Sequence, residues 1–379
     1  MADYDFIIAG GGAAGLSLAY HMLLSPLREK RILIIDKDDD DQLNRNWGFW
    51  TKEPTLFDRV VHHTWKELDF VSPSLQRRYD LGDYRYCLMH GSSFYTFVLQ
   101  RLAECPNITF QRGVIRKVRE SVDGACVEVD GHACTGSMVF NSIVRPNELR
   151  RQTPNSLWLR MQFKGWEIQT TTSAFDPRAA RLFDLRTPQE GLLRFFYVMP
   201  YGVDHAFIEY TVFSPNVLRQ TEYNTALHAY ISQVLDIQSY RVLCEENGAV
   251  GLTNYSFRRK ASPHIMNIGA RGGRIKPSTG YSFMRIQHDS AAIVQSLLQS
   301  GQPFDVPVER AVYRLCDTMM LRLMIENGSA IAPVFTQLFR SNPIDRILRF
   351  LDEEGNSIET LAIIASLARS PLMRELLHR

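Results

Sequence analysis

The sequence predicts an α/β fold with an N-terminal βαβ unit, an inserted antiparallel sheet and a helical C-terminal region. Three observations support this prediction. A short apolar strand, a glycine-rich turn and a helix open the chain. Long β-rich segments, separated by loops with Pro and Gly, run from 156 to 213. Apolar residues recur at helical spacing in the last part, 289–379.

The first elements form a βαβ unit. Residues 4–8 are predicted to be a strand and about 14–24 a helix. Residues 31–35 form a continuous apolar strand, which is typical of a buried parallel sheet. A helix over 91–103 and short strands between 108 and 129 follow.

The inserted block is predicted to be an antiparallel sheet. Its strands cover 156–163, 193–199 and 206–213, and a hairpin turn at 200–204 joins the last two. A helix over about 224–235 follows this block. The chain then returns to the first domain through an apolar strand at 264–268 and a glycine-rich loop.

The length predicts two domains, because the chain has 379 residues and a domain usually has about 100–200. We expect the first part of the nucleotide-binding domain in 1–150 and a β-rich substrate domain in 151–255. A return segment to the first domain is expected in 256–300, and a helical C-terminal region in 301–379.

Composition excludes several classes of protein. The net charge of +2 and the lack of a basic stripe argue against nucleic-acid binding. The six cysteines form no CxxC pair, so we expect small apolar fillers in a reducing compartment and no metal site. Neither a secretory signal nor a transmembrane stretch is evident. We therefore expect a cytoplasmic protein, with contact to a membrane surface left open; the oligomeric state stays unknown.

The N-terminal turn predicts a dinucleotide site. Gly10-Gly11-Gly12-Ala13-Ala14-Gly15 fits the pattern G-x-G-x-x-G between a strand and a helix. These glycines permit a tight turn, close approach of a pyrophosphate and close helix packing. Asp36 ends the next strand, where an acid binds the ribose hydroxyls. The fingerprint at the N-terminus and the chain's return after a β-rich insertion favour a Rossmann-like FAD domain over NAD as the resident cofactor.

A second glycine-rich loop covers 269–283, between an apolar strand and a helix. We expect its backbone to meet the flavin ring, with the helix N-terminus favouring an anionic reduced flavin; a plain surface loop is the alternative. The comparable loop of flavoprotein monooxygenases starts with Gly-Asp. Here Ala270 follows Gly269, which argues against a hydroxylase.

One acid stands out in a predicted strand. The two-residue period of a strand places Glu209 on one face between Phe207 and Phe213, together with Thr211. If this face is interior, desolvation raises the pKa of Glu209 and keeps its carboxyl neutral, as protonation of an alkene requires. A solvent-facing acid or a structural salt bridge is the alternative.

At this point the chain resembles the flavin-dependent lycopene cyclase family in its bacterial form. The resemblance spans residues 4 to about 352. It rests on the fingerprint with Asp36, on Asn46-Trp47-Gly48-Phe49-Trp50, on Phe207-Ile208-Glu209-Tyr210-Thr211 against the family's F-x-E-x-T, and on Lys276-Pro277-Ser278-Thr279-Gly280-Tyr281-Ser282 against "HPTTGYS". Many relatives have a second acid where Tyr210 stands, so the sequence leaves open whether a second acid assists Glu209.

The resemblance implies a redox-neutral cyclisation of the ψ-ends of an acyclic carotenoid such as lycopene to β-ionone rings. FAD is reduced by NAD(P)H, and Glu209 or the reduced flavin donates the proton. Trp47, Trp50, Trp166, Phe195, Phe196 and Tyr197 line a channel or pack as core. The expected cofactor contacts are Gly10, Gly12, Ala13, Ala14, Gly15, Asp36, Lys37, Val114, Pro277, Thr279, Gly280 and Tyr281.

Two other functions remain open. One is a flavin monooxygenase or isoprenoid reductase on the same scaffold, and the other is a non-catalytic membrane-associated flavoprotein. A carotenoid substrate also requires peripheral contact with a membrane. The apolar segment 331–340, which Arg346 and Arg349 follow, is either a membrane-binding surface or part of the core.

Overall fold

The computed structural model describes residues 2–37, 45–145, 147, 150–151 and 153–368. Its contacts divide the chain into two units, and each is described by itself. The first unit comprises Met1–Trp47, His90–Ser156 and Tyr255–Glu309, and the second comprises Gly48–Met89, Leu157–Asn254 and Arg310–Arg379. This division differs from the domain boundaries expected from the sequence, since residues 48–89 and the C-terminal helices belong with the inserted sheet.

The first unit is built on a mixed sheet with the order β17-β18-β11-β1-β2-β8, to which β10 and β9 attach beside β11. The pairings of β1 with β11 and β2, of β2 with β8 and of β11 with β18 are parallel. The strands are β1 (Tyr4–Ala9), β2 (Ile32–Asp36), β8 (Ile108–Arg112), β9 (Ile115–Ser121), β10 (Gly124–Val129), β11 (His132–Asn141), β17 (Lys260–Ser262) and β18 (Ile265–Asn267).

The first unit's helices carry its nucleotide-binding elements. They are α1 (Ala13–Leu23), η1 (Pro26–Glu29), α2 (Gly91–Ala103), η5 (Gly269–Gly272) and α5 (Phe283–Ser300). A buried polar bridge ties α1 to α5, because Gln287 donates to Ser17 (2.8 Å) and contacts the His21 ring (3.2 Å). The α/β fold with a Rossmann-like βαβ unit at the N-terminus, as predicted, is confirmed.

The second unit is built on a largely antiparallel sheet with the order β16-β12-β15-β14-β13-β5-β6; only β13 and β5 pair in parallel. A small sheet, β3-β7-β4, is also present. The strands are β3 (Asn46–Thr51), β4 (His63–Trp65), β5 (Glu67–Ser72), β6 (Leu75–Asp80), β7 (Arg85–His90), β12 (Trp158–Thr170), β13 (Ala179–Asp184), β14 (Leu193–Pro200), β15 (His205–Ser214) and β16 (Tyr240–Thr253).

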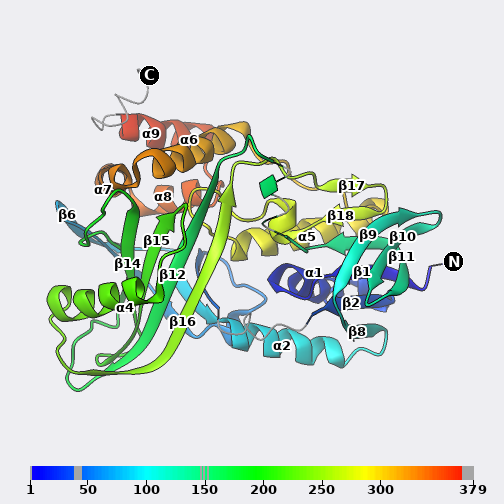
Figure 1. Cartoon of the computed structure of the whole chain (residues 1–379), viewed down its shortest axis with the longest axis horizontal. Coiled ribbons are helices and arrows are strands. Elements are labelled where there is room, and N and C mark those ends of the chain that lie inside the picture. Colours follow the sequence, from blue (N-terminus) through cyan, green and yellow to red (C-terminus); the bar gives the residue numbers. More distant parts are fainter. Residues whose placement is uncertain (1, 38–44, 146, 148–149, 152, 369–379) are drawn as a thin grey trace. The chain divides into compact units, whose positions relative to one another are not determined.

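Helix α4 covers one face of this larger sheet (Figure 1). Its buried side chains Tyr223 and Leu227 pack with Trp166, Ile208 and other strand residues in one apolar cluster. The second unit's helical segments are η3 (Asp58–Val60), α4 (Gln220–Ala229), the π-helix η4 (Tyr230–Val234), α6 (Ala311–Asn327), η6 (Gly328–Ala330), α7 (Ile331–Ser341), α8 (Ile344–Leu351) and α9 (Ser357–Ala368).

Helix α7 belongs to the core of the second unit. Phe339 stacks on Phe70 at 4.2 Å between ring centroids, and Phe335 meets Phe183 edge to face. Arg340, which ends the apolar run, donates to the Ser74 carbonyl. Of the two interpretations of segment 331–340, core packing is therefore correct and the membrane-binding surface is wrong, because its large apolar side chains are already buried.

Candidate active site

The glycine turn between β1 and α1 has the geometry that its sequence predicts. Gly10 has φ = +106°, a conformation that side chains disfavour. A Cβ atom on Gly15 would lie 2.0 Å from the Gly10 carbonyl oxygen, so only glycine allows α1 to pack this closely on the turn. Gly12 is the N-cap of α1 and provides no side-chain cap. The turn therefore leaves room at a helix N-terminus, where the backbone and the dipole favour a phosphate.

Asp36 lies beside this turn, at the end of β2. The Gly11 backbone N–H donates to its Oδ2 atom at 2.5 Å. The Gly113 N–H donates to the Asp36 carbonyl, which places the exposed Val114 next to the end of β2. Lys37 follows Asp36 and is exposed. The structure thus brings these predicted cofactor residues together around the end of β2.

The second glycine-rich loop adjoins the first. A Cβ on Gly269, which has φ = +58°, would lie 2.5 Å from the Cβ atom of Ala14 in α1. Next in the loop is a tight turn in which the Lys276 carbonyl accepts hydrogen bonds from the N–H groups of Thr279 and Gly280. This turn presents the predicted residues Pro277, Thr279, Gly280 and Tyr281 just before α5.

Both loops of the first unit fit a dinucleotide that carries a flavin. The cradle at Gly10–Gly15 is one that a Cβ atom would fill, and Asp36 offers a carboxylate at the ribose position. The fit supports the expected cofactor class, and the individual contacts stay predictions.

Glu209 lies in the middle of β15 in the second unit. Strand register places it directly opposite Tyr197 of β14 and Gly165 of β12. Facing residues of an antiparallel pair point to the same side of the sheet. Since Ile208 and Tyr210 belong to the cluster beneath α4, Glu209 points to the opposite face, as the period-two pattern predicts.

The surroundings of Glu209 favour its neutral form. Burial raises the pKa of Glu209 to about 7, against a hydrogen bond from the Thr211 hydroxyl (2.8 Å) that acts in the opposite direction. The side chain nevertheless remains partly accessible. No printed ion pair holds it among the described residues, so the alternative of a structural salt bridge gains no support. Glu209 therefore has the properties of a general acid that works near neutral pH.

Aromatic rings form the floor around Glu209. The ring of Phe207 lies over Gly165, because a Cβ on that glycine would fall 2.1 Å from the ring's Cζ atom. In the same way, the ring of Phe163 lies over Gly248 of β16, at 2.5 Å. These rings cover the backbone on both sides of the row that contains Glu209 and offer π-faces to a cation.

The six aromatic residues predicted for a channel separate into groups. Phe195 and Tyr197 lie on the Glu209 face, with ring centroids 5.2 Å apart. Trp166 and Phe196 belong to the cluster beneath α4, so their expected place in a channel beside Glu209 is wrong. The other two lie outside this face: Trp47 packs against Phe94 and Phe283 in the first unit, and Trp50 is buried in β3.

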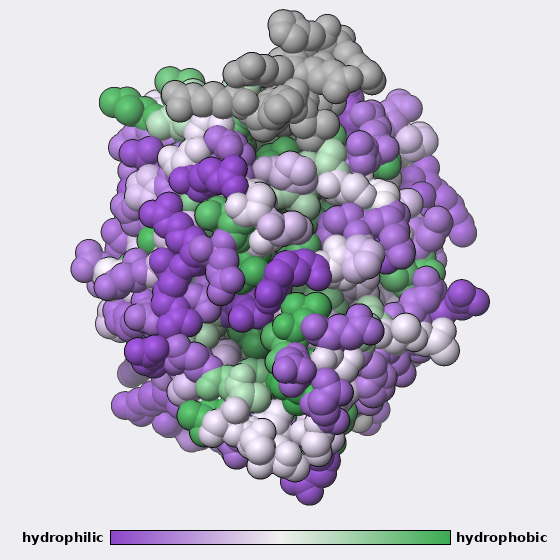
Figure 2. Space-filling view, turned by 90° about the vertical axis from the view of Figure 1, so that its left-hand side faces the viewer, coloured by the Kyte–Doolittle hydropathy of each residue, from purple (hydrophilic) through white to green (hydrophobic). Residues whose placement is uncertain are grey.

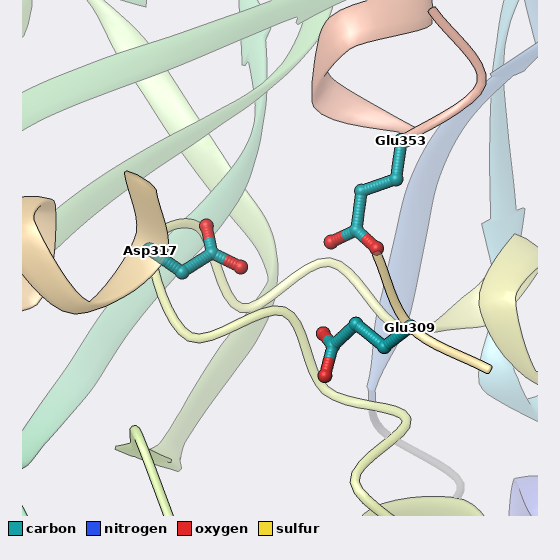
Figure 3. Close-up of side chains that lie close together, drawn as sticks. All are labelled: Glu309, Asp317 and Glu353. Atoms are coloured by element: carbon teal, nitrogen blue, oxygen red, sulfur yellow. The ribbon is translucent and has the colours of Figure 1, made fainter. Parts of the chain in front are cut away.

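No metal is assigned to the acidic side chains in Figure 3. Asp317 of α6 and Glu353, which follows α8, belong to the second unit. Glu309 ends the first unit, where it pairs with Arg285 at 3.5 Å. The two carboxylates of the second unit are fewer ligands than Mg²⁺ or Ca²⁺ usually requires from a protein site of its own. The expectation of a protein without a metal site stays a prediction.

Comparison with known proteins decides the family. The family model described as "Lycopene cyclase protein" matches residues 5–377, nearly the whole chain. The chain belongs to the lycopene cyclase family. The resemblance noted in the sequence is thereby confirmed. No curated protein matches the chain significantly.

Solved structures show that this lycopene cyclase family member shares its fold with flavoproteins. A geranylgeranyl bacteriochlorophyll reductase-like protein from Thermoplasma acidophilum has a TM-score of 0.61 at 14% identity, covering 99% of this chain and 98% of its own. A flavoprotein/dehydrogenase from Cytophaga hutchinsonii gives 0.63 at 10%, covering 97% and 100%. HpxO from Klebsiella pneumoniae, complexed with FAD, gives 0.62 at 10%, covering 94% and 98%.

Sequence reasoning missed one carboxyl group on the Glu209 face. Glu246 of β16 is only 3% exposed and lies opposite Gly165, in the same row as Glu209. The strand was not predicted because its centre, Glu245-Glu246-Asn247-Gly248, contains residues that are rare in strands. A small signal was present, since Val242 and Val250 stand in even register with Glu246.

Proposed function

We propose that this chain is a lycopene cyclase, an intramolecular lyase or isomerase that closes the ψ-ends of an acyclic carotenoid such as lycopene into β-ionone rings. The observation that carries the proposal is Glu209. In a chain of this family, a carboxyl with a pKa of about 7 lies on an aromatic sheet face at the family's motif position. A neutral carboxyl beside aromatic rings suits protonation of an apolar alkene.

Glu209 begins the reaction by giving its proton to the terminal double bond. The neighbouring alkene then closes a six-membered ring, and a proton leaves the ring to set the new double bond. The rings of Phe207 and Phe163 exclude water from the cationic intermediate and stabilise it through their π-faces. Every proton gained is lost again, so the reaction consumes no oxidant or reductant.

FAD is the proposed cofactor, with NAD(P)H as its reductant. Gly10, Gly12 and Gly15 would hold the pyrophosphate at α1, and Asp36 the ribose. The loop with Pro277 and Gly280 would meet the ring. When bound in reduced form, the flavin supplies negative charge that stabilises developing positive charge.

Contact with a membrane is part of the proposal, because a carotene is insoluble in water and has to be taken from a bilayer. In the part of the chain that the structure describes, no helix is both long and apolar enough to span one. Figure 2 shows hydrophobic side chains exposed between hydrophilic ones, with no continuous apolar face on that side. Helix α9 exposes Ile358 (80%) and Leu361 (63%), and α6 exposes Leu315 (60%). We propose that these residues insert into the interface.

The test uses purified protein with reduced FAD and lycopene in the absence of oxygen. We expect wild-type protein to form a product isomeric with lycopene, of unchanged mass. Glu209→Gln keeps the shape of the side chain and loses its proton, so we expect its rate to fall by at least ~10²-fold with flavin binding intact. A product that has gained oxygen or hydrogen would instead identify a monooxygenase or reductase. Near-normal cyclisation by Glu209→Gln would move the acid role to another group.

A further inference from the structure

The second carboxyl of the site comes from a strand two places away from Glu209. Register places Glu209, Gly165 and Glu246 in one row across β15, β12 and β16. Residues directly opposite one another share a face, so both carboxyls stand on the same side of the sheet. Between them the row has only a glycine, which contributes no side chain.

A residue at position 210 is unable to share this face with Glu209. Tyr210 lies in the cluster beneath α4, with its ring stacked on Phe196 at 4.7 Å. Successive strand residues point to opposite faces, so an acid in this position would point away from Glu209. The structure thus answers the question that the sequence leaves open: the carboxyl that accompanies Glu209 on its face is on β16.

Other acids near Glu246 have different surroundings. Its neighbour Glu245 is exposed on the opposite face and pairs with Lys164 at 2.8 Å. Glu167 shares the face but contacts the His205 ring at 2.8 Å. Glu246 itself is buried, and its negative charge helps to raise the pKa of the Tyr201 hydroxyl, after burial and the charge of Glu167.

Two carboxyls in one site tend to differ in charge, because repulsion disfavours ionisation of both. With Glu209 neutral, Glu246 is the group that carries the negative charge. A cyclisation that gains one proton and loses another requires just such an acid and a base. The register separates the two residues by two strand spacings, roughly 10 Å between backbones, which leaves space for an end group between the carboxyls.

We propose that Glu246 is the base that removes the ring proton after Glu209 has delivered its own, and so decides where the ring double bond forms. The step balances. The O–H bond of Glu209 breaks as a C–H bond forms at the alkene, and the alkene electron pair forms the ring C–C bond. A ring C–H bond then breaks, its electrons become the new double bond, and the proton passes to the Glu246 carboxylate. Water returns the pair to its starting state. This inference rests on the proposed function.

The test compares Glu246→Gln with Glu245→Gln, a matched control on the same strand but the opposite face. Both are incubated with reduced FAD and lycopene, and the ring type is determined by chromatography and NMR. We expect Glu246→Gln to form β-rings at least ~10-fold more slowly and to lose the proton from other ring positions, giving a mixture of double-bond isomers. Glu246→Asp should restore part of the β-ring yield, and Glu245→Gln should match wild type.

Flavin binding and thermal unfolding are measured for each variant, so that a folding defect is recognised. If wild type cyclises lycopene and folded Glu246→Gln forms the same ring at the same rate, this inference is wrong and the proposed function stands. If wild type forms no ring, the proposed function itself is wrong, and the inference fails with it.

Discussion

Glu209 concentrates the chemistry of the second unit in one side chain. Its partial accessibility permits a substrate or water to reach the carboxyl, while the protein around it disfavours the charged form. Thr211, two residues along the same face, orients the carboxyl through its hydroxyl. Both residues belong to the family motif, so the motif encodes an acid together with the group that holds it.

The pKa of Glu209 predicts how stability depends on pH. The pKa is about 7 in the folded protein against 4.5 ordinarily, so between these values the folded state retains a proton that the unfolded state releases. Folding stability of wild type should therefore fall as pH rises from about 4.5 to 7, by up to about 3 kcal/mol relative to Glu209→Gln. Urea unfolding at several pH values measures this difference. A difference that is constant with pH would contradict the raised pKa.

The glycine turn is the element that the sequence predicts best. Its strand, turn and helix follow from local rules, because positive φ at Gly10 and the close contact at Gly15 both require glycine. The hairpin of β10 and β11 is equally local, since Asp130 and Gly131 both have positive φ, as a tight turn requires.

A substitution in this turn should abolish cofactor binding. Gly12 precedes α1 at the point where a pyrophosphate approaches the backbone, so we expect Gly12→Val to lose bound FAD without a large loss of secondary structure. Flavin absorbance after gel filtration and circular dichroism measure the two effects. Gly251→Val is the control, because a Cβ at Gly251 meets nothing within 4 Å. Full flavin occupancy in Gly12→Val would place the cofactor elsewhere.

Helix α7 offers a prediction about packing. Phe339 is 2% exposed and stacks on Phe70, so Phe339→Ala should lower the free energy of unfolding by about 3–5 kcal/mol. Leu361→Ala on the exposed side of α9 should change it by less than about 0.5 kcal/mol. Denaturant unfolding of both variants decides this; equal effects would mean that α7 is not part of the core.

Other elements depend on contacts that are distant in the sequence. Strands β5 and β6 join the larger sheet through β13, more than a hundred residues later, and no local pattern announces that pairing. Strand β16 contains polar and glycine residues and is held by its long pairing with β12. Glu246 was missed for the same reason: its place opposite Gly165 depends on the register of the whole sheet.

At the scale of the whole molecule, the chain combines a dinucleotide-binding unit with a sheet that carries an acid on an aromatic face. Flavoproteins with other printed activities share this fold, so the fold alone does not decide the reaction. The family match and the surroundings of Glu209 are what favour cyclisation over hydroxylation or reduction.

Membrane contact is also a property of the whole molecule. We expect purified protein to float with liposomes that contain anionic lipids. Ile358→Ser/Leu361→Ser should float less, because it removes two apolar side chains that α9 exposes. Val217→Ser, at a 71% exposed position just before α4, is the control. Wild type that stays at the bottom of the gradient would exclude docking, and equal flotation of all variants would place the contact elsewhere.

The most direct test of the central claim is cyclisation in D₂O with reduced FAD and lycopene. A redox-neutral closure adds one solvent deuteron to each new ring and releases one hydrogen, so wild type should give a product heavier by one deuterium-for-hydrogen exchange per ring, with no reducing equivalents consumed. Glu209→Gln should give this product at least ~10²-fold more slowly. A product that has gained hydrogen or oxygen overall, or rapid deuterium incorporation by Glu209→Gln, would contradict the account.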